Sequence, residues 1–257
     1  MEIGQLPGLE GKAALIVGGG YGIGRSVARL LVKQKVRIAV VDLDAERVRA
    51  AEDELGAVGV HADVQQPGAA RQAVEVASNA LAKLDILINI VGKGAAMPAT
   101  QVSAELERSV LERNFLHHIE FCSAFSQQAL AAGRPGVITM VSSLSGVVPF
   151  PEEAAYGAAK AALNSYCANL AVELAPKHIR VNAVAPGVVR TDRNPMEGEQ
   201  AAGFLPAIPM GRFADQSEIA AVIAFLCSDM ASYITAQTLV IDGGAGHYSR
   251  FWRNGRQ

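Results

Sequence analysis

The sequence predicts an α/β fold, with one doubly wound parallel sheet of about seven strands and helices on both of its faces. Short apolar runs alternate with amphipathic or alanine-rich segments almost from end to end, as in strands joined by helical crossovers. The apolar runs lack the polar alternation of half-exposed strands, as expected when both faces of a sheet are covered. A chain of 257 residues is a common size for one α/β domain, so we assign residues 1–257 to a single domain.

The expected elements follow one another in a regular order. Strands are predicted where short runs are apolar: residues 13–17, 36–41, 58–62, 86–91, 137–141, 180–184 and 237–241. Helices are predicted where apolar residues recur at helical spacing: residues 23–33, 45–55, 67–83, 103–132, 154–174 and 216–226. Pro67 opens the third helix, and Gly133 ends the fourth.

Residues 192–211 are the one long stretch without clear periodicity, and they are rich in Pro, Gly, Met and Glu. In a compact domain such a stretch is usually a functional lid or a disordered segment, and we interpret it as a substrate lid. A C-terminal tail, residues 245–257, follows the last strand and carries aromatic residues. These aromatics suit either a subunit contact or part of a neighbouring pocket.

Composition excludes several classes of protein. Half of the residues are hydrophobic, and the net charge of -2 gives no reason to expect nucleic acid or an anionic membrane as a partner. The longest apolar runs are far shorter than a membrane span. The three cysteines lie far apart, with no metal-binding or disulfide spacing. The first residues show no basic segment followed by an apolar run, so we expect a cytoplasmic protein.

A glycine-rich turn joins the first strand to the first helix, at Gly18, Gly22 and Gly24. Glycine there lets the backbone approach a pyrophosphate, which the free N–H groups of the helix N-terminus can bind. Asp42 ends the next strand, eighteen residues after Gly24, where a carboxylate accepts the ribose hydroxyls of NAD and repels the additional phosphate of NADP. Neither Tyr21 nor Leu43 supplies a cation for that phosphate. The pattern favours NAD, although Asp42 also suits a plain polar strand terminus.

Tyr156 and Lys160 lie four residues apart in a predicted helix, so they share one helix face. A neighbouring ammonium favours the phenolate and lowers the pKa of a tyrosine. A phenol tuned in this way can exchange a proton with a substrate oxygen. The spacing alone is common by chance, and its meaning depends on the rest of the chain.

Together with Ser143, thirteen residues before Tyr156, these motifs resemble the short-chain dehydrogenase/reductase family, whose compact single-domain members have a Rossmann-type fold. The resemblance extends from about Leu9 to Gly244. Val17 departs from it by replacing a threonine, and Ile90 and Val91 replace Asn-Ala. The resemblance implies a cofactor site formed by Gly18, Tyr21, Gly22, Ile23, Gly24, Asp42, Leu43, Asp63, Val64, Asn89, Val91, Gly92, Tyr156, Lys160, Pro186, Gly187, Val189 and Thr191.

The same resemblance implies four catalytic residues, Asn114, Ser143, Tyr156 and Lys160. Tyr156 would be the general acid/base, Lys160 would lower its pKa and hold the nicotinamide ribose, and Ser143 would donate to the substrate oxygen. Asn114 would interrupt its helix and hold a water next to Lys160. Ser143 could instead merely end a strand, and Asn114 could be an exposed helix residue. We interpret His117 and His118 as a helix surface or subunit contact.

The residues that contact the substrate are harder to predict from the sequence. Apolar residues of the lid and of the segment after Ser143 favour an apolar or alicyclic secondary alcohol or ketone. Our candidate substrate contacts are Ser145, Phe150, Met196 and Phe204. We therefore expect an NAD(H)-dependent oxidoreductase without a metal, acting on a small molecule and assembled as a homodimer or homotetramer. The alternatives are a 3-oxoacyl-carrier-protein reductase and, in another class, a dinucleotide-sensing regulatory protein.

Overall fold

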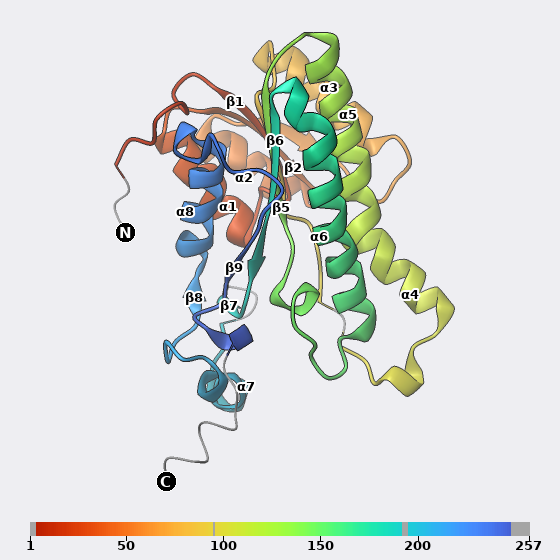
Figure 1. Ribbon diagram of the computed structural model, residues 1–257. Coiled ribbons are helices and arrows are strands. Elements are labelled where there is room, and N and C mark those ends of the chain that lie inside the picture. The colour runs from red at the N-terminus through yellow and green to blue at the C-terminus, as the bar shows by residue number, and fades with distance from the viewer. Residues whose placement is uncertain (1–3, 95, 192–194, 248–257) are drawn as a thin grey trace.

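The computed structural model describes residues 4–94, 96–191 and 195–247 (Figure 1). Its centre is a seven-stranded sheet in the order β3-β2-β1-β4-β5-β6-β9, with every neighbouring pair parallel. The strands are β1 (Ala13–Val17), β2 (Arg37–Asp42), β3 (Val58–His61), β4 (Ile86–Asn89), β5 (Gly136–Val141), β6 (Ile179–Pro186) and β9 (Thr238–Ile241). The chain starts at β1, builds outward to β3, and returns to β4 on the other side of β1. This order confirms the predicted doubly wound, Rossmann-type sheet.

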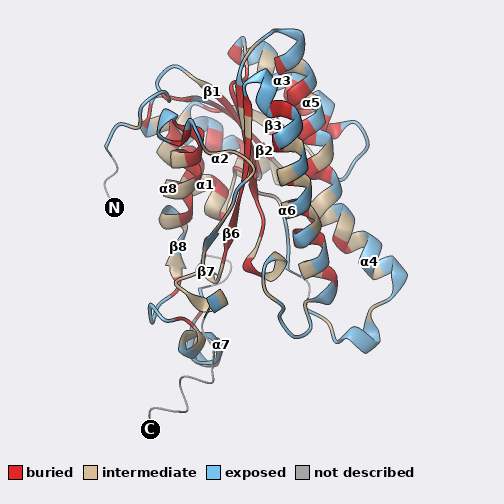
Figure 2. Cartoon of the chain, viewed as in Figure 1, coloured by how far each residue is buried: buried red, intermediate tan, exposed pale blue. Residues whose placement is uncertain are grey.

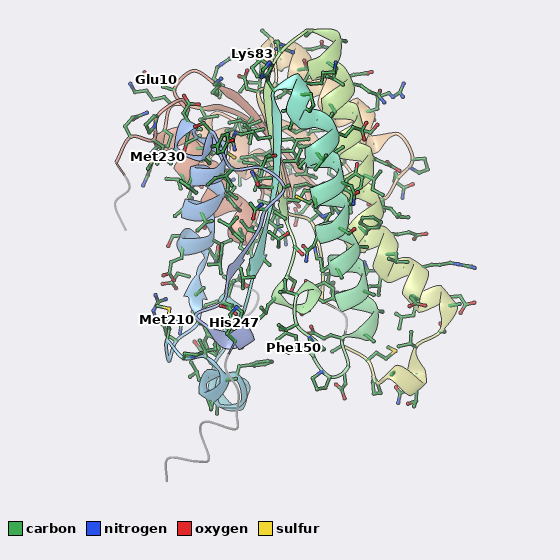
Figure 3. The ribbon with its side chains drawn as sticks, viewed as in Figure 1. Glu10, Lys83, Phe150, Met210, Met230 and His247 are labelled. Carbon is green, nitrogen blue, oxygen red and sulfur yellow. The ribbon has the colours of Figure 1, made fainter. Side chains whose placement is uncertain are left out.

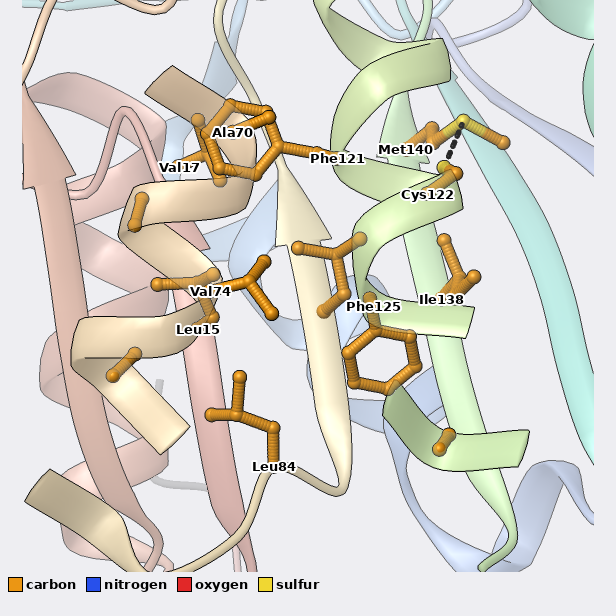
Figure 4. Packing of buried hydrophobic residues seen from close by; sticks show 14 of the residues in the cluster. Leu15, Val17, Ala70, Val74, Leu84, Phe121, Cys122, Phe125, Ile138 and Met140 are labelled. Atoms are coloured by element: carbon orange, nitrogen blue, oxygen red, sulfur yellow. Dashed lines mark hydrogen bonds between the residues drawn. The ribbon is translucent and has the colours of Figure 1, made fainter. Parts of the chain in front are cut away.

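Helices cover both faces of the sheet (Figure 1). They are α1 (Gly22–Lys33), α2 (Ala45–Leu55), α3 (Ala69–Leu81), α4 (Ala104–Leu111), α5 (His117–Ala131), α6 (Ala154–Leu174), α7 (Gly198–Phe204) and α8 (Gln216–Cys227). Side chains of α3, α5 and α6 form one hydrophobic core with the sheet, and those of α1, α2 and α8 form the other. Phe121 and Phe125 of α5 pack near Val74 of α3 in the first core (Figure 4).

The structure explains why polar and apolar residues do not alternate along the strands. All five residues of β1 and all four of β4 are buried, because helices cover the sheet on both sides (Figure 2). Both faces of a strand must then be apolar.

Several predicted boundaries differ from the structure, and four elements differ by more than one residue or by an interruption of the element. The long helix expected over residues 103–132 is α4 and α5 joined by a π-helical turn, η2 (Glu112–Leu116). Helix α3 begins at Ala69 and not at Pro67, because Gly68 has a φ of 83°, outside the helical region. Strand β4 ends at Asn89, two residues early, whereas β6 extends to Pro186.

The carboxyl ends of the strands meet at one edge of the sheet, where the lid and the loop after β5 lie. Phe150, Met210 and His247 mark this end, and Glu10 and Lys83 mark the opposite one (Figure 3). The described part of the predicted lid includes α7 and leads to a short parallel pair, β7 (Val189–Arg190) and β8 (Ala214–Asp215). Residues 192–194 of the lid and 248–257 of the tail lie outside the described residues. No helix in the described ranges is long and apolar enough to cross a membrane.

Candidate active site

Helix α6 carries Tyr156 and Lys160 at the carboxyl edge of the sheet. Lys160 is 2% exposed, and its Nζ donates a hydrogen bond of 2.9 Å to the carbonyl oxygen of Val141. The same Nζ lies 6.0 Å from the centroid of the Tyr156 ring. Burial lowers the pKa of Lys160 to about 7, because removal from water disfavours the ammonium. The structure thus brings the two residues together as predicted.

The pKa of Tyr156 is raised in the structure, and not lowered as expected. Burial raises the pKa of Tyr156, a hydrogen bond with Ser143 opposes the increase, and the charge of Glu153 adds to it. The Lys160 ammonium faces Val141 and the tyrosine ring, so it makes no hydrogen bond to the phenol oxygen. A bound cation near the phenol would favour the phenolate, and the positively charged nicotinamide ring of NAD is such a group.

Ser143 is the second residue after the end of β5. It begins the short helix η3 (Leu144–Gly146), and its Oγ accepts a hydrogen bond of 3.2 Å from the Ser145 backbone N–H. Ser143 Oγ also donates to Ser145 Oγ at 3.3 Å, and Ser145 Oγ donates to the carboxylate of Glu153. Sequence reasoning found both serines and missed Glu153. The available signal was its position, just before α6 and three residues before Tyr156.

Asn114 is fully buried in the π-helical turn, which contradicts the reading of it as an exposed helix residue. Its Nδ2 donates to Val110 O at 2.9 Å, and its Oδ1 accepts from the Lys93 backbone N–H at 2.8 Å. A β-carbon at Gly92 would lie 2.9 Å from Lys160 Nζ and 3.0 Å from Asn114 Oδ1. Glycine at position 92 therefore lets the lysine and the asparagine approach the same short piece of backbone.

His117 and His118 are buried, at 2% and 0% exposure, so the prediction of a helix surface or subunit contact is wrong. The cause is the π-helical turn, which rotates the start of α5 toward the sheet. His117 hydrogen-bonds Asn89 Nδ2 at 3.3 Å and Arg113 O at 3.1 Å. Burial lowers the pKa of His117 to about 4, and the charge of Lys160 acts in the same direction.

The glycine turn has the shape needed to hold a pyrophosphate. Gly18 and Gly22 have φ values of 82° and 55°, which other residues rarely adopt. A β-carbon at Gly24 would lie 1.9 Å from Gly18 O, so the helix and the turn meet with no room for a side chain. The first turn of α1 carries no acidic residue that would oppose an anion. Gly18, Gly22, Gly24 and the intervening Ile23 therefore fit a dinucleotide phosphate site.

Asp42 stands at the end of β2, beside this turn. Its carboxylate accepts from the backbone N–H groups of Gly20 at 3.2 Å and Asp44 at 3.1 Å. Arg47 of α2 places Nη1 3.8 Å from Asp42 Oδ1, and its guanidinium lies 4.8 Å from the Tyr21 ring centroid. Sequence reasoning sought a cation only at positions 21 and 43, and so it missed Arg47 one helical turn beyond Asp42.

Comparison with known proteins decides the family. The family model described as enoyl-(acyl carrier protein) reductase matches residues 18–246. The chain belongs to the short-chain dehydrogenase/reductase family. It is 34% identical over 243 residues to a D-threitol dehydrogenase of Mycolicibacterium smegmatis, covering 92% of this chain and 93% of that one. It is 34% identical over 238 residues to a 3-oxoacyl-(acyl-carrier-protein) reductase of Escherichia coli, covering 91% and 97%.

Solved structures agree. The chain is similar to a dehydrogenase/reductase from Sinorhizobium meliloti, with a TM-score of 0.86 at 32% identity over 94% of this chain and 96% of that one. It is also similar to a short-chain type dehydrogenase/reductase from Mycobacterium marinum, with a TM-score of 0.87 at 29% identity over 92% and 96%. As a member of this family, the protein is an oxidoreductase that uses a nicotinamide dinucleotide.

The remaining predicted cofactor positions of this short-chain dehydrogenase/reductase lie along the carboxyl edge of the sheet. Hydrogen bonds from Gln66 and the Gln65 backbone lower the pKa of Asp63. Val91 packs over the glycine turn, where a β-carbon on Gly18 would lie 2.9 Å from its Cγ2. Of the other predicted positions, Leu43 is exposed, Val64 is buried, and Asn89 hydrogen-bonds His117. Pro186 ends β6 and Gly187 follows it, and Val189 lies in β7 with Thr191 just after it.

The substrate candidates separate into two groups. Ser145 lies within the hydrogen-bond chain of Ser143. Phe150, in the loop after β5, is 38% exposed, and Phe204, at the end of α7, is 45% exposed. Met196 is only 3% exposed and packs with Ile208 and Phe213 in a small hydrophobic cluster of the lid. Met196 therefore holds the lid together. Among the described residues, no group of three His, Cys, Asp or Glu side chains is placed to hold a metal ion.

Proposed function

We propose that this protein is an NAD(H)-dependent oxidoreductase that interconverts a secondary alcohol and a ketone, with Tyr156 as the general acid/base. The observation that carries the proposal is the arrangement of Ser143, Tyr156 and Lys160 at one edge of the sheet. Ser143 hydrogen-bonds Tyr156, and the buried Lys160 ammonium lies 6.0 Å from the tyrosine ring. This arrangement holds a proton donor and acceptor next to a hydroxyl that can bind a substrate oxygen.

Each residue has a defined task in this mechanism. When bound, NAD supplies the hydride acceptor, and NADH the donor. Tyr156 takes the proton of the alcohol on oxidation and returns a proton to the carbonyl oxygen on reduction. The Ser143 hydroxyl donates to the substrate oxygen and stabilises the negative charge that develops there. Lys160 has a pKa near 7 and can therefore gain or lose a proton at neutral pH, next to Asn114 and Gly92.

The preference for NAD over NADP rests on the charges around Asp42. The three arginines near the glycine turn are already paired with carboxylates: Arg25 and Arg29 with Glu54, each at 2.6 Å, and Arg47 with Asp42 and Asp44, at 3.8 and 3.3 Å. Binding NADP would add a phosphate beside Asp42 and would require one of these pairs to break. NAD needs only hydroxyl contacts with the carboxylate.

Two measurements test the proposal. NAD should raise the melting temperature more than NADP at equal concentration, and Asp42→Ala should reduce that difference. A panel of steroid, cyclic and aromatic secondary alcohols, followed by NADH absorbance, should contain at least one substrate. Equal shifts with the two cofactors would contradict the role of Asp42. A panel without any turnover would favour the dinucleotide-sensing alternative.

A 3-oxoacyl-carrier-protein reductase is the second candidate, and the matched family model and the similarity to the Escherichia coli reductase support it. A carrier protein is acidic and needs a basic docking surface, whereas this chain has a net charge of -2. For that reason we favour a small apolar or alicyclic alcohol or ketone. NADPH-dependent reduction of an acetoacetyl thioester, faster than any ketone of the panel, would reverse this order.

We also propose a cytoplasmic homodimer or homotetramer assembled through α5 and α6. These helices expose Leu130 at 42% and Val172 at 71% to solvent, and Leu116 of the adjoining turn η2 is 43% exposed. Small residues such as Ala158 and Ala161 on the exposed side of α6 permit close helix contact. Light scattering on the purified chain tests the assembly, and a monomer at all concentrations would contradict it.

A further inference from the structure

The carboxylate of Glu153 has no counter-ion within the described ranges of the chain. No cation among the described residues forms an ion pair with it, and Ser145 Oγ, bonded to Oε2, is the one hydrogen-bond donor that reaches the side chain. Oε1 has no partner in the described part of the chain. Glu153 is the residue before α6, yet its side chain makes no capping hydrogen bond to the helix. Helix capping therefore does not account for this half-buried carboxylate.

Glu153 is connected to the reaction centre by hydroxyl groups. Ser145 Oγ donates to Glu153, Ser143 Oγ lies 3.3 Å from Ser145 Oγ, and Ser143 hydrogen-bonds Tyr156. The carboxylate oxygen is thus at most about 6 Å from Ser143 Oγ, if a normal O–H···O length is taken for the bond to Ser145. The negative charge of Glu153 also raises the pKa of Tyr156, which agrees with this proximity.

A carboxylate next to a reacting centre selects ligands by hydrogen-bond donors. An ionised carboxyl group only accepts hydrogen bonds, at about four lone-pair positions, and a described residue donates to Glu153 at only one of them. Removing such a group from water without a partner is unfavourable, so a ligand that brings a hydroxyl donor to it recovers the lost interaction. A ligand that brings an alkyl or ether group instead leaves the carboxylate unsatisfied.

We infer that Glu153, held by Ser145, binds a second hydroxyl of the substrate, on the carbon next to the one that is oxidised or reduced. The substrates are then vicinal diols and the corresponding α-hydroxy ketones, with their carbon skeleton against the apolar loops. The inference rests on the proposed function, since it places the first oxygen of the substrate between Ser143 and Tyr156. Glu153 is a specificity-determining residue in this arrangement, and Ser145 is a positioning residue.

The test compares two alcohols that differ in one donor. The enzyme is assayed with saturating NAD on trans-1,2-cyclohexanediol and on trans-2-methoxycyclohexanol, which keeps the second oxygen and loses its proton. Wild-type enzyme should have the higher kcat/KM for the diol. In Glu153→Met the ratio of the two kcat/KM values should fall by about tenfold or more, because a hydrogen bond to a charged group is lost. Glu153→Gln retains an acceptor oxygen and should show a smaller fall.

The neighbouring Glu152 supplies a matched control. It is exposed and precedes Glu153, so Glu152→Gln should keep the wild-type ratio. An unchanged ratio in Glu153→Met would overturn the inference, and Glu153→Gln gives the answer if the Met variant does not fold. If wild type oxidises neither alcohol, the proposed function is wrong for this substrate class. Saturation-transfer NMR on the enzyme with NADH then decides the role of Glu153: weaker binding of the diol in the variants supports it, and equal binding refutes it.

Discussion

Gly92 lies so close to Lys160 that a β-carbon at residue 92 would come within 2.9 Å of the lysine Nζ. The same β-carbon would lie 3.0 Å from Asn114 Oδ1. Three segments distant in sequence therefore meet at one point: the loop after β4, the π-helical turn, and α6. The absence of a side chain at position 92 is a requirement of this close approach of Lys160 and Asn114.

Replacing Gly92 with Ala should lower activity much more than stability. The methyl group meets the end of a flexible side chain, so Lys160 can move aside, but its hydrogen bond to Val141 O is then lost or lengthened. A displacement of about 1 Å in a catalytic group can reduce the rate about 100-fold. We expect kcat to fall by about that factor while the melting temperature changes by only a few degrees. Gly94→Ala is the matched control, because a β-carbon there has no neighbour within 4 Å; equal activities of the two variants would contradict the prediction.

Replacing Tyr156 with Phe removes the phenolic hydroxyl and leaves the ring in place. We expect kcat to fall by a factor of about 100 to 10,000, the usual contribution of a general acid/base. The glycine turn and Asp42 are untouched, so NAD should still raise the melting temperature of the variant. Turnover near the wild-type rate would disprove the assigned role, and loss of the NAD-induced shift would show that the substitution damaged the cofactor site.

The fold could be predicted because each of its signals is local. Apolar runs such as residues 13–17 and the periodic segment of residues 154–174 have the bounds of β1 and α6, since burial on both faces and helical spacing are both visible in sequence. The π-helical turn at Asn114 was harder to place. It changes which residues of α5 face the sheet, and for this reason the burial of His117 and His118 was not predicted.

Some residues of the candidate site could be predicted from the sequence, and others could not. Ser143, Tyr156 and Lys160 could be found from spacing on single elements. Arg47 and Glu153 became functional candidates only when the chain was folded, because each acts on a residue of another segment, Arg47 on Tyr21 and Glu153 on Ser145. Sequence spacing does not encode such contacts between elements.

Lys160 should make the stability of the cofactor-free enzyme depend on pH. Its pKa is about 7 in the folded protein, below its value of 10.5 in the unfolded chain. Between these values the unfolded state binds more protons, so the free energy of unfolding rises with pH. From pH 7 to pH 9 the gain is about 2 kcal/mol. Urea denaturation at fixed protein concentration measures this gain. The free energy of unfolding of Lys160→Met should lack the increase between pH 7 and pH 9, whereas exposed Lys177→Met should keep it. A parallel pH dependence of wild type and Lys160→Met would contradict the burial of a titrating lysine.

His118 should make the enzyme sensitive to acid. The ring is fully buried, and neither ring nitrogen makes a hydrogen bond of normal geometry with a described residue, although the Val91 backbone acts on the pKa of His118 in the direction opposite to burial. Burial lowers the pKa of His118 well below its usual value, and the charges of His117 and Lys160 act in the same direction. As pH falls below about 6.5 the unfolded chain binds a proton that folded His118 does not, so the free energy of unfolding decreases. His118→Leu removes this proton uptake, so its free energy of unfolding should fall less than that of wild type between pH 7 and pH 5. Exposed His61→Leu serves as the control, and an equal acid-induced loss in His118→Leu and wild type would show that His118 is protonated in the folded protein.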